Sequence, residues 1–301
     1  RRRRLKRGAH GPDDPIPVPR PISISALTAL ELAPPDLVSI AAAAGYSHVG
    51  LRLVAPTTTE PRRAMIGDTP MVRETRARLD ATGIQVLDIE VLRLTPGTRV
   101  ADDLLPAIET GARLGAKYAL VTGNDPDEAR LVDRFAELCD LAARCGVSPQ
   151  LEFMSFSDLK TLSQAARVIE RAGRDNAGIV VDAYHFSRTR CQLADIARVP
   201  ASRFRYAQLC DAPAAIPATQ EAVLAEARSA RRFPGDGELD LVSLVRALPP
   251  GIPVAVESPT LELAKTVDAL ERARRAIAGV RRVLDAAGLD RADARAGQET
   301  M

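Results

Sequence analysis

The sequence predicts a single (β/α)8 barrel, the fold called a TIM barrel, on three observations. Eight short apolar runs alternate with helical patterns, and parallel strands joined by helices give an α/β fold. The runs lack strict polar–apolar alternation, as expected of strands buried on both faces. Eight units within 301 residues favour one closed barrel over an open sheet, because such a barrel needs roughly 250 residues.

The individual elements are predicted from apolar periodicity, proline or capping residues at helix starts, and glycines at helix ends. Strands are expected at residues 22–25, 48–53, 84–89, 118–121, 149–153, 178–182, 206–211 and 252–257. Helices are expected at residues 34–45, 69–83, 102–114, 126–146, 157–172, 219–229, 240–248 and 261–287.

The barrel is predicted to span residues 19–288, between a basic tail at 1–18 and a flexible tail at 289–301. Residues 1–18 begin with four arginines and lack the apolar segment of a secretion signal. This pattern favours a disordered tail over an arm that binds nucleic acid or a membrane surface. Because the first twenty residues carry seven Arg or Lys, the remainder is mildly acidic, and no nucleic-acid partner is expected.

The composition, 46% hydrophobic and 27% charged, is typical of a soluble globular protein. No apolar run approaches the roughly 20 residues that span a bilayer, so no membrane partner is expected. The four cysteines lack CxxC spacing and are predicted to be free thiols, which indicates a cytoplasmic protein. Neither a dinucleotide-binding GxGxxG after the first strand nor a P-loop motif occurs.

Four of the predicted strands carry a polar side chain at or near their carboxyl end: Glu152, Asp182, Gln208 and Glu257. An unpaired charge is costly inside a buried strand, and the carboxyl ends of barrel strands all face one mouth. We therefore expect the four side chains to converge. This oxygen-rich set suits one hard divalent cation, Mn²⁺ or Mg²⁺, with Co²⁺ as a further candidate. Zinc usually prefers His and Cys, and the chain has only three histidines.

Five motifs give the sequence a family resemblance over about residues 20–285. They are Leu-Glu-Phe at 151–153, Val-Asp-Ala-Tyr-His at 181–185, Ala-Gln-Leu-Cys-Asp at 207–211, Arg-Arg-Phe-Pro-Gly-Asp-Gly-Glu-Leu-Asp at 231–240 and Val-Glu-Ser at 256–258. The chain resembles the xylose-isomerase-like TIM-barrel superfamily, in particular the sugar phosphate isomerase/epimerase group. That group also includes inosose dehydratases, hydroxypyruvate isomerases and 3-dehydroshikimate dehydratases.

The resemblance implies the metal ligands Glu152, Asp182, Gln208 and Glu257. Many relatives have His at the third position, so Gln208 shifts the expected preference further toward Mg²⁺ or Mn²⁺. His185 is expected to hydrogen-bond a substrate oxygen beside the metal.

Further polar residues are predicted to bind substrate. Arg231 matches an arginine that meets the substrate in relatives, with its neighbour Arg232 as the competing choice. The other predicted substrate ligands are Asp211, Arg52 and Glu90. Either Arg52 or Arg93 is expected to bind a substrate carboxylate or phosphate.

The implied reaction is proton abstraction next to a metal-bound carbonyl of a small polyhydroxylated substrate, with Glu152 and Glu257 exchanging acid and base roles. Reprotonation of the enediolate gives an isomerase or epimerase, whereas loss of a β-hydroxyl gives a dehydratase or lyase. A non-catalytic barrel is a third hypothesis. An apurinic-site endonuclease is disfavoured, because it needs a His-rich cluster of three zinc ions. Relatives are often dimers or tetramers, so a homo-oligomer is among the expectations.

Overall fold

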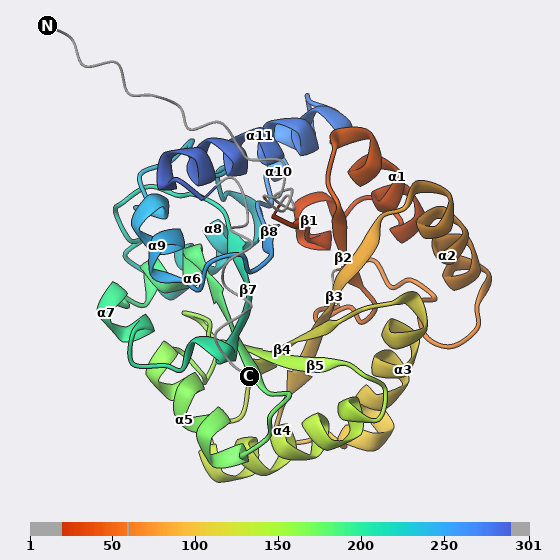
Figure 1. The fold of residues 1–301 in the computed structure, drawn as a ribbon, viewed down its shortest axis with the longest axis vertical. Helices are drawn as coiled ribbons and strands as arrows, with labels where there is room; N and C mark the ends of the chain where they lie inside the picture. The colour runs from red at the N-terminus through yellow and green to blue at the C-terminus, as the bar shows by residue number, and fades with distance from the viewer. Residues whose placement is uncertain (1–19, 59, 290–301) are drawn as a thin grey trace, which may run out of the picture.

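Eight parallel strands close into a barrel in the computed structural model, which describes residues 20–58 and 60–289 (Figure 1). The predicted (β/α)8 fold is therefore confirmed. The strands are β1 (Ile22–Ile24), β2 (His48–Arg52), β3 (Gln85–Leu94), β4 (Tyr118–Gly123), β5 (Ser148–Glu152), β6 (Gly178–Asp182), β7 (Phe204–Leu209) and β8 (Val254–Val256). Apart from Leu289, the tails predicted at 1–18 and 289–301 lie outside the described residues.

The barrel closes between its two shortest strands. β1 pairs with β8 through Ile22 with Val254 and Ile24 with Val256. Because all neighbouring strands are parallel, their carboxyl ends meet at one mouth, as a closed barrel requires.

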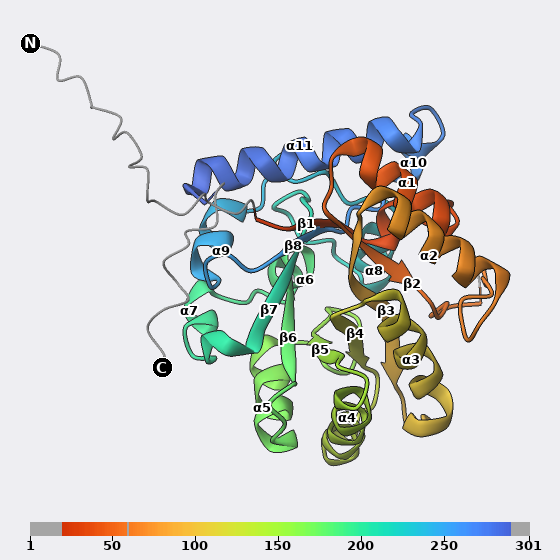
Figure 2. The same ribbon diagram turned by 45° about the vertical axis from the view of Figure 1, so that its right-hand side comes forward.

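Helices form the outer ring around the strands (Figure 1). They are η1 (Ala26–Ala29), α1 (Pro34–Ala44), α2 (Pro70–Thr82), η2 (Val100–Leu104), α3 (Leu105–Leu114), α4 (Glu128–Ala143), α5 (Leu162–Ala172), α6 (Ala183–Arg188), α7 (Leu193–Ile196), η3 (Ala201–Arg203), α8 (Gln220–Ser229), α9 (Leu241–Ala247), α10 (Leu261–Ala264) and α11 (Ala269–Ala287). The last helix, α11, packs against α1 and α9 and so joins the two ends of the ring (Figure 2).

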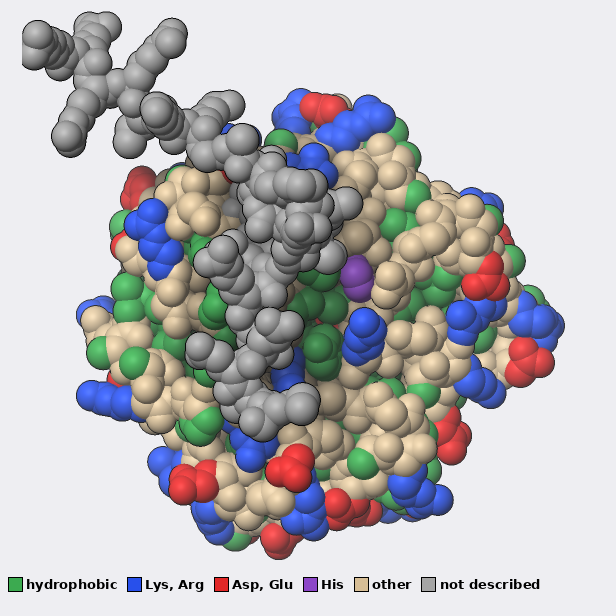
Figure 3. All heavy atoms as spheres, in the orientation of Figure 1, with side chains coloured by type: hydrophobic (Ala, Val, Ile, Leu, Met, Phe, Trp, Pro, Cys, Tyr) green, Lys and Arg blue, Asp and Glu red, His purple; other side chains and the backbone are tan. Residues whose placement is uncertain are grey.

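Each long helix turns one apolar face toward the strands. In α5 the buried residues Leu162, Ala165, Val168, Ile169 and Ala172 recur at the three- and four-residue spacing of one helix face. Charged side chains lie mainly around the outer ring on the face drawn in Figure 3. Burial of these apolar stripes against the strands holds the helices in place.

Two predicted helix boundaries are wrong. The helix predicted from residue 157 begins at Leu162, because the Ser157 hydroxyl donates to the Leu159 carbonyl at 2.6 Å and closes a turn. Thr161 and Gln164 then form a capping box at the true start. The helix predicted at 261–287 is divided into α10 and α11, because Asp268 accepts from the Glu271 N–H and starts a new helix.

Other elements differ in extent from the prediction. β3 continues to Leu94, so Glu90 lies within the strand and does not end it. β7 ends at Leu209, which leaves Cys210 and Asp211 in the following loop. The first turn of the helix predicted at 102–114 is a π-helix, η2. The short helices α6 and α7 have no counterpart in the sequence-based assignment.

Within the described residues, no helix has both the length and the apolar character needed to cross a bilayer. All four cysteines belong to this part of the chain, and each is a free thiol, as predicted.

Candidate metal centre and active-site pocket

The four predicted metal ligands lie side by side at the carboxyl mouth of the barrel. Glu152 ends β5 and Asp182 ends β6. Gln208 is the penultimate residue of β7, in register with Asp182, and Glu257 directly follows β8. All four side chains are buried. Their convergence follows from the parallel register, which aligns the ends of neighbouring strands.

Asp182 also starts a helix that brings His185 to the same place. Its Oδ1 accepts from the His185 backbone N–H at 2.9 Å, which makes Asp182 the N-cap of α6. His185 Nε2 then lies 3.9 Å from Glu152 Oε1. One possible ligand atom from each of Glu152, Asp182 and His185 lies within 4.8 Å of the others, a spacing suited to holding a metal ion.

Gln208, Glu257 and Arg231 form the other half of the cluster. Gln208 Nε2 donates to Glu257 Oε1 at 2.9 Å. Arg231 Nη1 lies 2.9 Å from Asp182 Oδ2 and 3.1 Å from Glu257 Oε2. The carboxylates of Asp182 and Glu257 thus share one guanidinium nitrogen, which links the β6 and β8 sides of the mouth.

Two buried oxygens of this cluster have no hydrogen-bond partner among the described residues: Glu152 Oε1 and Gln208 Oε1. A buried acceptor without a donor is costly, and oxygen atoms of this kind are the ligands that hard divalent cations prefer. The side chains present therefore fit a divalent cation, with His185 available as a nitrogen ligand.

Burial and mutual repulsion shift the acid–base behaviour of the centre. Burial, with the charges of Glu257 and Asp182, raises the pKa of Glu152 well above its usual range. Burial raises the pKa of Glu257 to about 8 despite the opposing charge of Arg231. Burial lowers the pKa of His185 to about 3, so the imidazole is neutral and able to bind a metal. A bound cation would favour the charged carboxylates and lower both glutamate pKa values.

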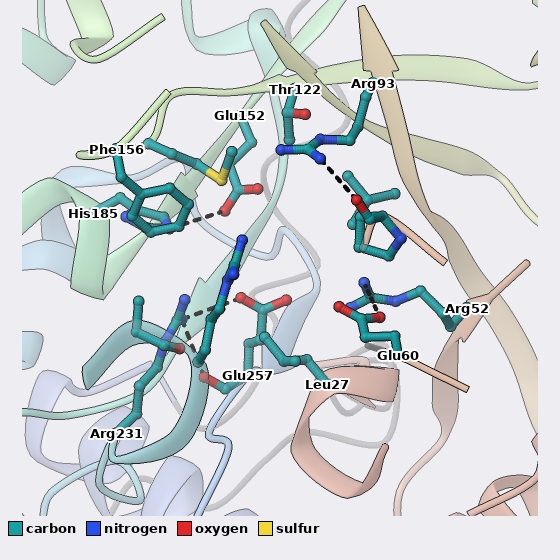
Figure 4. Close-up of a pocket in the computed structure, with 15 residues that line it drawn as sticks. Leu27, Arg52, Glu60, Arg93, Thr122, Glu152, Phe156, His185, Arg231 and Glu257 are labelled. Carbon is teal, nitrogen blue, oxygen red and sulfur yellow. Dashed lines mark hydrogen bonds and ion pairs between the residues drawn. The ribbon is translucent and has the colours of Figure 1, made fainter. Parts of the chain in front are cut away.

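The cluster opens into a pocket at the barrel mouth (Figure 4). Its wall includes Glu152, His185, Arg231 and Glu257 together with four other charged residues, Arg52, Glu60, Arg93 and Arg228. Phe156 packs edge-on against His185, with ring centroids 5.1 Å apart, and adds an apolar surface. Such a pocket, with polar groups gathered at one end, is suited to a small polar molecule.

Arg52 lines this pocket, but its charge is already paired. Its guanidinium contacts Glu60 Oε2 at 3.1 Å and Glu90 Oε2 at 3.0 Å. Glu90, predicted as a substrate ligand, also accepts from the Ala26 N–H at 2.7 Å and is absent from the pocket wall. Glu90 thus anchors Arg52 and the start of η1.

Asp211 lies outside the pocket wall, in the loop after β7. Its Oδ1 accepts from the backbone N–H groups of Ala212 and Leu239, and its Oδ2 accepts from that of Gly235. The carboxylate predicted to bind substrate is thus occupied by the backbone of the loop between β7 and β8. Of the two candidate arginines, Arg231 lines the pocket, whereas Arg232 is exposed.

Glu60 and Arg228 are pocket residues that sequence reasoning missed. Glu60 lies in a loop rich in Pro and Thr, and Arg228 lies near the end of α8. No motif or strand end marks either position. The tertiary structure alone brings them to the mouth.

The closed (β/α)8 barrel thus carries an acidic mouth, with a candidate metal centre at the ends of β5 to β8. The chain belongs to the family described as xylose isomerase-like TIM barrel, which matches residues 38–285.

The chain is similar to an isomerase and to a dehydratase. An inosose isomerase of Bacillus licheniformis is 28% identical over 153 residues, 47% of this chain and 52% of that protein. A 3-dehydroshikimate dehydratase of Pseudomonas aeruginosa is 28% identical over 138 residues, 44% of this chain and 21% of that protein. The matches thus span about half or less of these curated relatives. A crystal structure described as the IOLI protein with a binding zinc atom superposes with a TM-score of 0.70 at 20% identity, covering 89% of this chain and 98% of the other.

Proposed function

We propose that the protein is a divalent-metal-dependent isomerase or epimerase that moves a proton next to the carbonyl of a small sugar or keto-polyol. The observation that carries this proposal is the pair of buried carboxylates, Glu152 and Glu257, which both line one pocket (Figure 4). Burial raises the pKa values of both carboxyl groups, and a bound cation would lower them again, so the two groups can accept and return a proton. The match to an inosose isomerase supports a keto-polyol substrate.

The proposed metal ligands are Glu152, Asp182, Gln208 and Glu257, with His185 as an additional or alternative ligand. The preponderance of oxygen atoms favours Mn²⁺ or Mg²⁺, with Co²⁺ as a further candidate. When bound, such a cation polarises a substrate carbonyl and makes the neighbouring C–H bond more acidic.

The side chains of this chain have distinct proposed tasks. One of Glu152 and Glu257 takes the proton from carbon, and the other returns a proton to the substrate from its own side of the pocket. His185 hydrogen-bonds a substrate oxygen when it is not itself a ligand. Arg231 holds the carboxylates of Asp182 and Glu257 in place through its shared nitrogen. The barrel mouth limits the water around these groups, which strengthens each electrostatic contact.

A dehydratase or lyase is the second candidate, favoured by the match to a 3-dehydroshikimate dehydratase. It begins with the same proton abstraction, but the electrons expel a β-hydroxyl group. Glu152 or Glu257 then donates the proton that accompanies the leaving water.

A panel of ketoses and cyclic keto-polyols, incubated with Mn²⁺ in D₂O, tests these proposals. Exchange of the hydrogen next to the carbonyl, followed by NMR, indicates isomerase or epimerase chemistry. New ultraviolet absorbance from a conjugated enone indicates dehydration. Metal analysis of the purified protein accompanies both measurements.

Glu152→Gln and Glu257→Gln should each lower turnover by about 10²- to 10⁴-fold, because each removes an acid–base group. Glu262→Gln is the matched control, since this exposed glutamate forms an ion pair with Lys265 and does not line the pocket. Retention of normal turnover in both active-site variants would refute the mechanism. A non-catalytic barrel would instead be supported if the original protein shows no turnover and both variants bind ligand as tightly as the original does.

A further inference from the structure

Four arginines line the pocket, and they fall into two pairs. Arg52 contacts Glu60 and Glu90, and Arg231 contacts Asp182 and Glu257. Carboxylates thus neutralise the first two guanidinium groups. Arg93 and Arg228 make up the second pair, and their surroundings are different.

Among the residues that the structure describes, two neutral groups hold Arg93 on the pocket wall. Its Nε donates to Asn124 Oδ1 at 3.3 Å, and its Nη1 donates to the Pro56 carbonyl at 2.8 Å. The side chain is half-buried and extends from β3 toward the pocket (Figure 4). These two bonds fix the direction of the guanidinium and leave its positive charge unpaired.

Arg228 stands at the rim of the same pocket with its guanidinium carbon 5.9 Å from the centre of the Phe156 ring. It forms no hydrogen bond or ion pair with any residue of the described ranges 20–58 and 60–289. Burial, followed by the charge of Arg228, lowers the pKa of Arg93, so the two like charges repel each other across the pocket.

With a divalent cation bound, the charges at the pocket would sum to one positive charge. A divalent cation and Arg231 together would balance the three carboxylates of the metal centre. Glu60 and Glu90 more than balance Arg52. The charge of Glu60 also acts on Arg93 and Arg228, but neither arginine is in ion-pair contact with a carboxylate of residues 20–58 or 60–289. These two arginines therefore carry the net positive charge, on the wall formed by β3 and α8.

We propose that the substrate carries an anionic group, a carboxylate or a phosphate, which Arg93 and Arg228 bind together. Two guanidinium groups that face one site match the geometry of such an oxyanion, and charge-assisted hydrogen bonds to it are stronger than neutral ones. The anion relieves the repulsion between the two arginines. This inference rests on the proposed function, since it places the reacting carbonyl beside Glu152 and Glu257 in the same pocket. It narrows the substrate class to polyhydroxylated keto acids or ketose phosphates.

Equilibrium binding measured by calorimetry on the Mn²⁺-loaded protein tests the inference without requiring turnover. The probes are inosose and fructose as neutral compounds, 3-dehydroshikimate as a carboxylate, and fructose 6-phosphate as a phosphate. At least one anionic probe should bind about tenfold or more tightly than the neutral probes. Which anionic probe binds distinguishes a carboxylate from a phosphate.

Arg93→Gln and Arg228→Gln should each weaken binding of the preferred anionic probe by about tenfold and leave the neutral probes unchanged. Arg274→Gln, which removes an exposed arginine on α11, is the control for net charge. The inference is overturned if no anionic probe binds more tightly than the neutral ones. It is also overturned if both pocket variants weaken neutral and anionic probes equally.

The two proposals fail in different ways. Proton exchange on neutral compounds, without a preference for anions, would refute the anion site and leave the proposed chemistry intact. Tight, arginine-dependent binding of an anion without metal-dependent proton exchange would refute the proposed chemistry alone.

Discussion

Replacing Asp211 with asparagine should destabilise the loop between β7 and β8 without removing a contact to substrate. The sequence pattern predicts Asp211 as a substrate ligand, but its carboxylate accepts three backbone N–H groups, from Ala212, Gly235 and Leu239. The residue is 1% exposed, so water cannot replace these bonds. Because Arg231 precedes Gly235 in this loop, Asp211 acts on the centre by positioning the loop.

The magnitude follows from the lost acceptor. An asparagine amide has one oxygen, so at least one of the three N–H groups would face an NH₂ group instead of an acceptor. A hydrogen bond to a charged group contributes about 1.5–3 kcal/mol, and a buried donor left unpaired costs a similar amount. We therefore expect Asp211→Asn to lower the free energy of unfolding by about 3 kcal/mol, which corresponds to about 6–12 °C in Tm for a barrel of this size.

Thermal and urea unfolding followed by circular dichroism measure this loss, and Mn²⁺ affinity serves as a second readout. Asp236→Asn is the matched control in the same loop, because its exposed pair with Arg282 should contribute less than about 1 kcal/mol. The metal affinity of folded Asp211→Asn should stay within about threefold of the original. Normal stability combined with impaired substrate binding would show that Asp211 contacts substrate and would refute this reasoning.

Three further predictions concern the metal ligand Gln208, the buried His48 at the start of β2 and the packing of α11. Gln208→His should raise the affinity for Zn²⁺ relative to Mn²⁺ by about tenfold, because imidazole suits zinc better than an amide oxygen does. Competition with a chelating dye measures the two affinities, and an unchanged ratio would argue against Gln208 as a ligand. Burial, assisted by Lys117, lowers the pKa of His48 to about 4, below its unfolded value, so folding favours the neutral ring. The free energy of unfolding should therefore fall as the pH drops from about 6.5 to 4, and His48→Gln should make that fall smaller by about 2 kcal/mol. Urea titrations at several pH values measure the effect, and an identical pH profile for the variant would contradict it. Gly279→Ala should lower the free energy of unfolding by about 1–3 kcal/mol, because the added Cβ would lie 2.2 Å from the Pro234 carbonyl oxygen. Thermal unfolding measures this loss, and an unchanged Tm would show that the segment at Pro234 moves away without loss of stability.

The barrel and the convergence of Glu152, Asp182, Gln208 and Glu257 could be predicted from sequence, because both depend on local patterns. Apolar runs mark the strands, and parallel register carries their last residues to one mouth. Helix ends such as Gly45 were also predictable, since its φ of 87° is one that glycine adopts without steric cost.

The remaining features depend on contacts that residue type does not reveal. The family resemblance predicts His185 beside the metal, but its approach to Glu152 depends on Asp182 capping α6, a helix too short to give a periodic signal. Asp211 is predicted to bind substrate at the end of the seventh strand, yet backbone N–H groups from distant residues occupy its carboxylate. Arg228 reaches the pocket through the packing of α8, which no local pattern specifies.

The contact of Arg231 with both Asp182 and Glu257 bears on how the protein would take up the proposed metal ion. Without a counter-ion, the acidic residues at the mouth would repel each other and strain the strand ends. The guanidinium supplies that counter-ion from within the chain, so the apoprotein should fold before any metal is loaded. Dialysis against a chelator should consequently yield an intact, reloadable barrel, in contrast to small zinc domains that unfold when stripped.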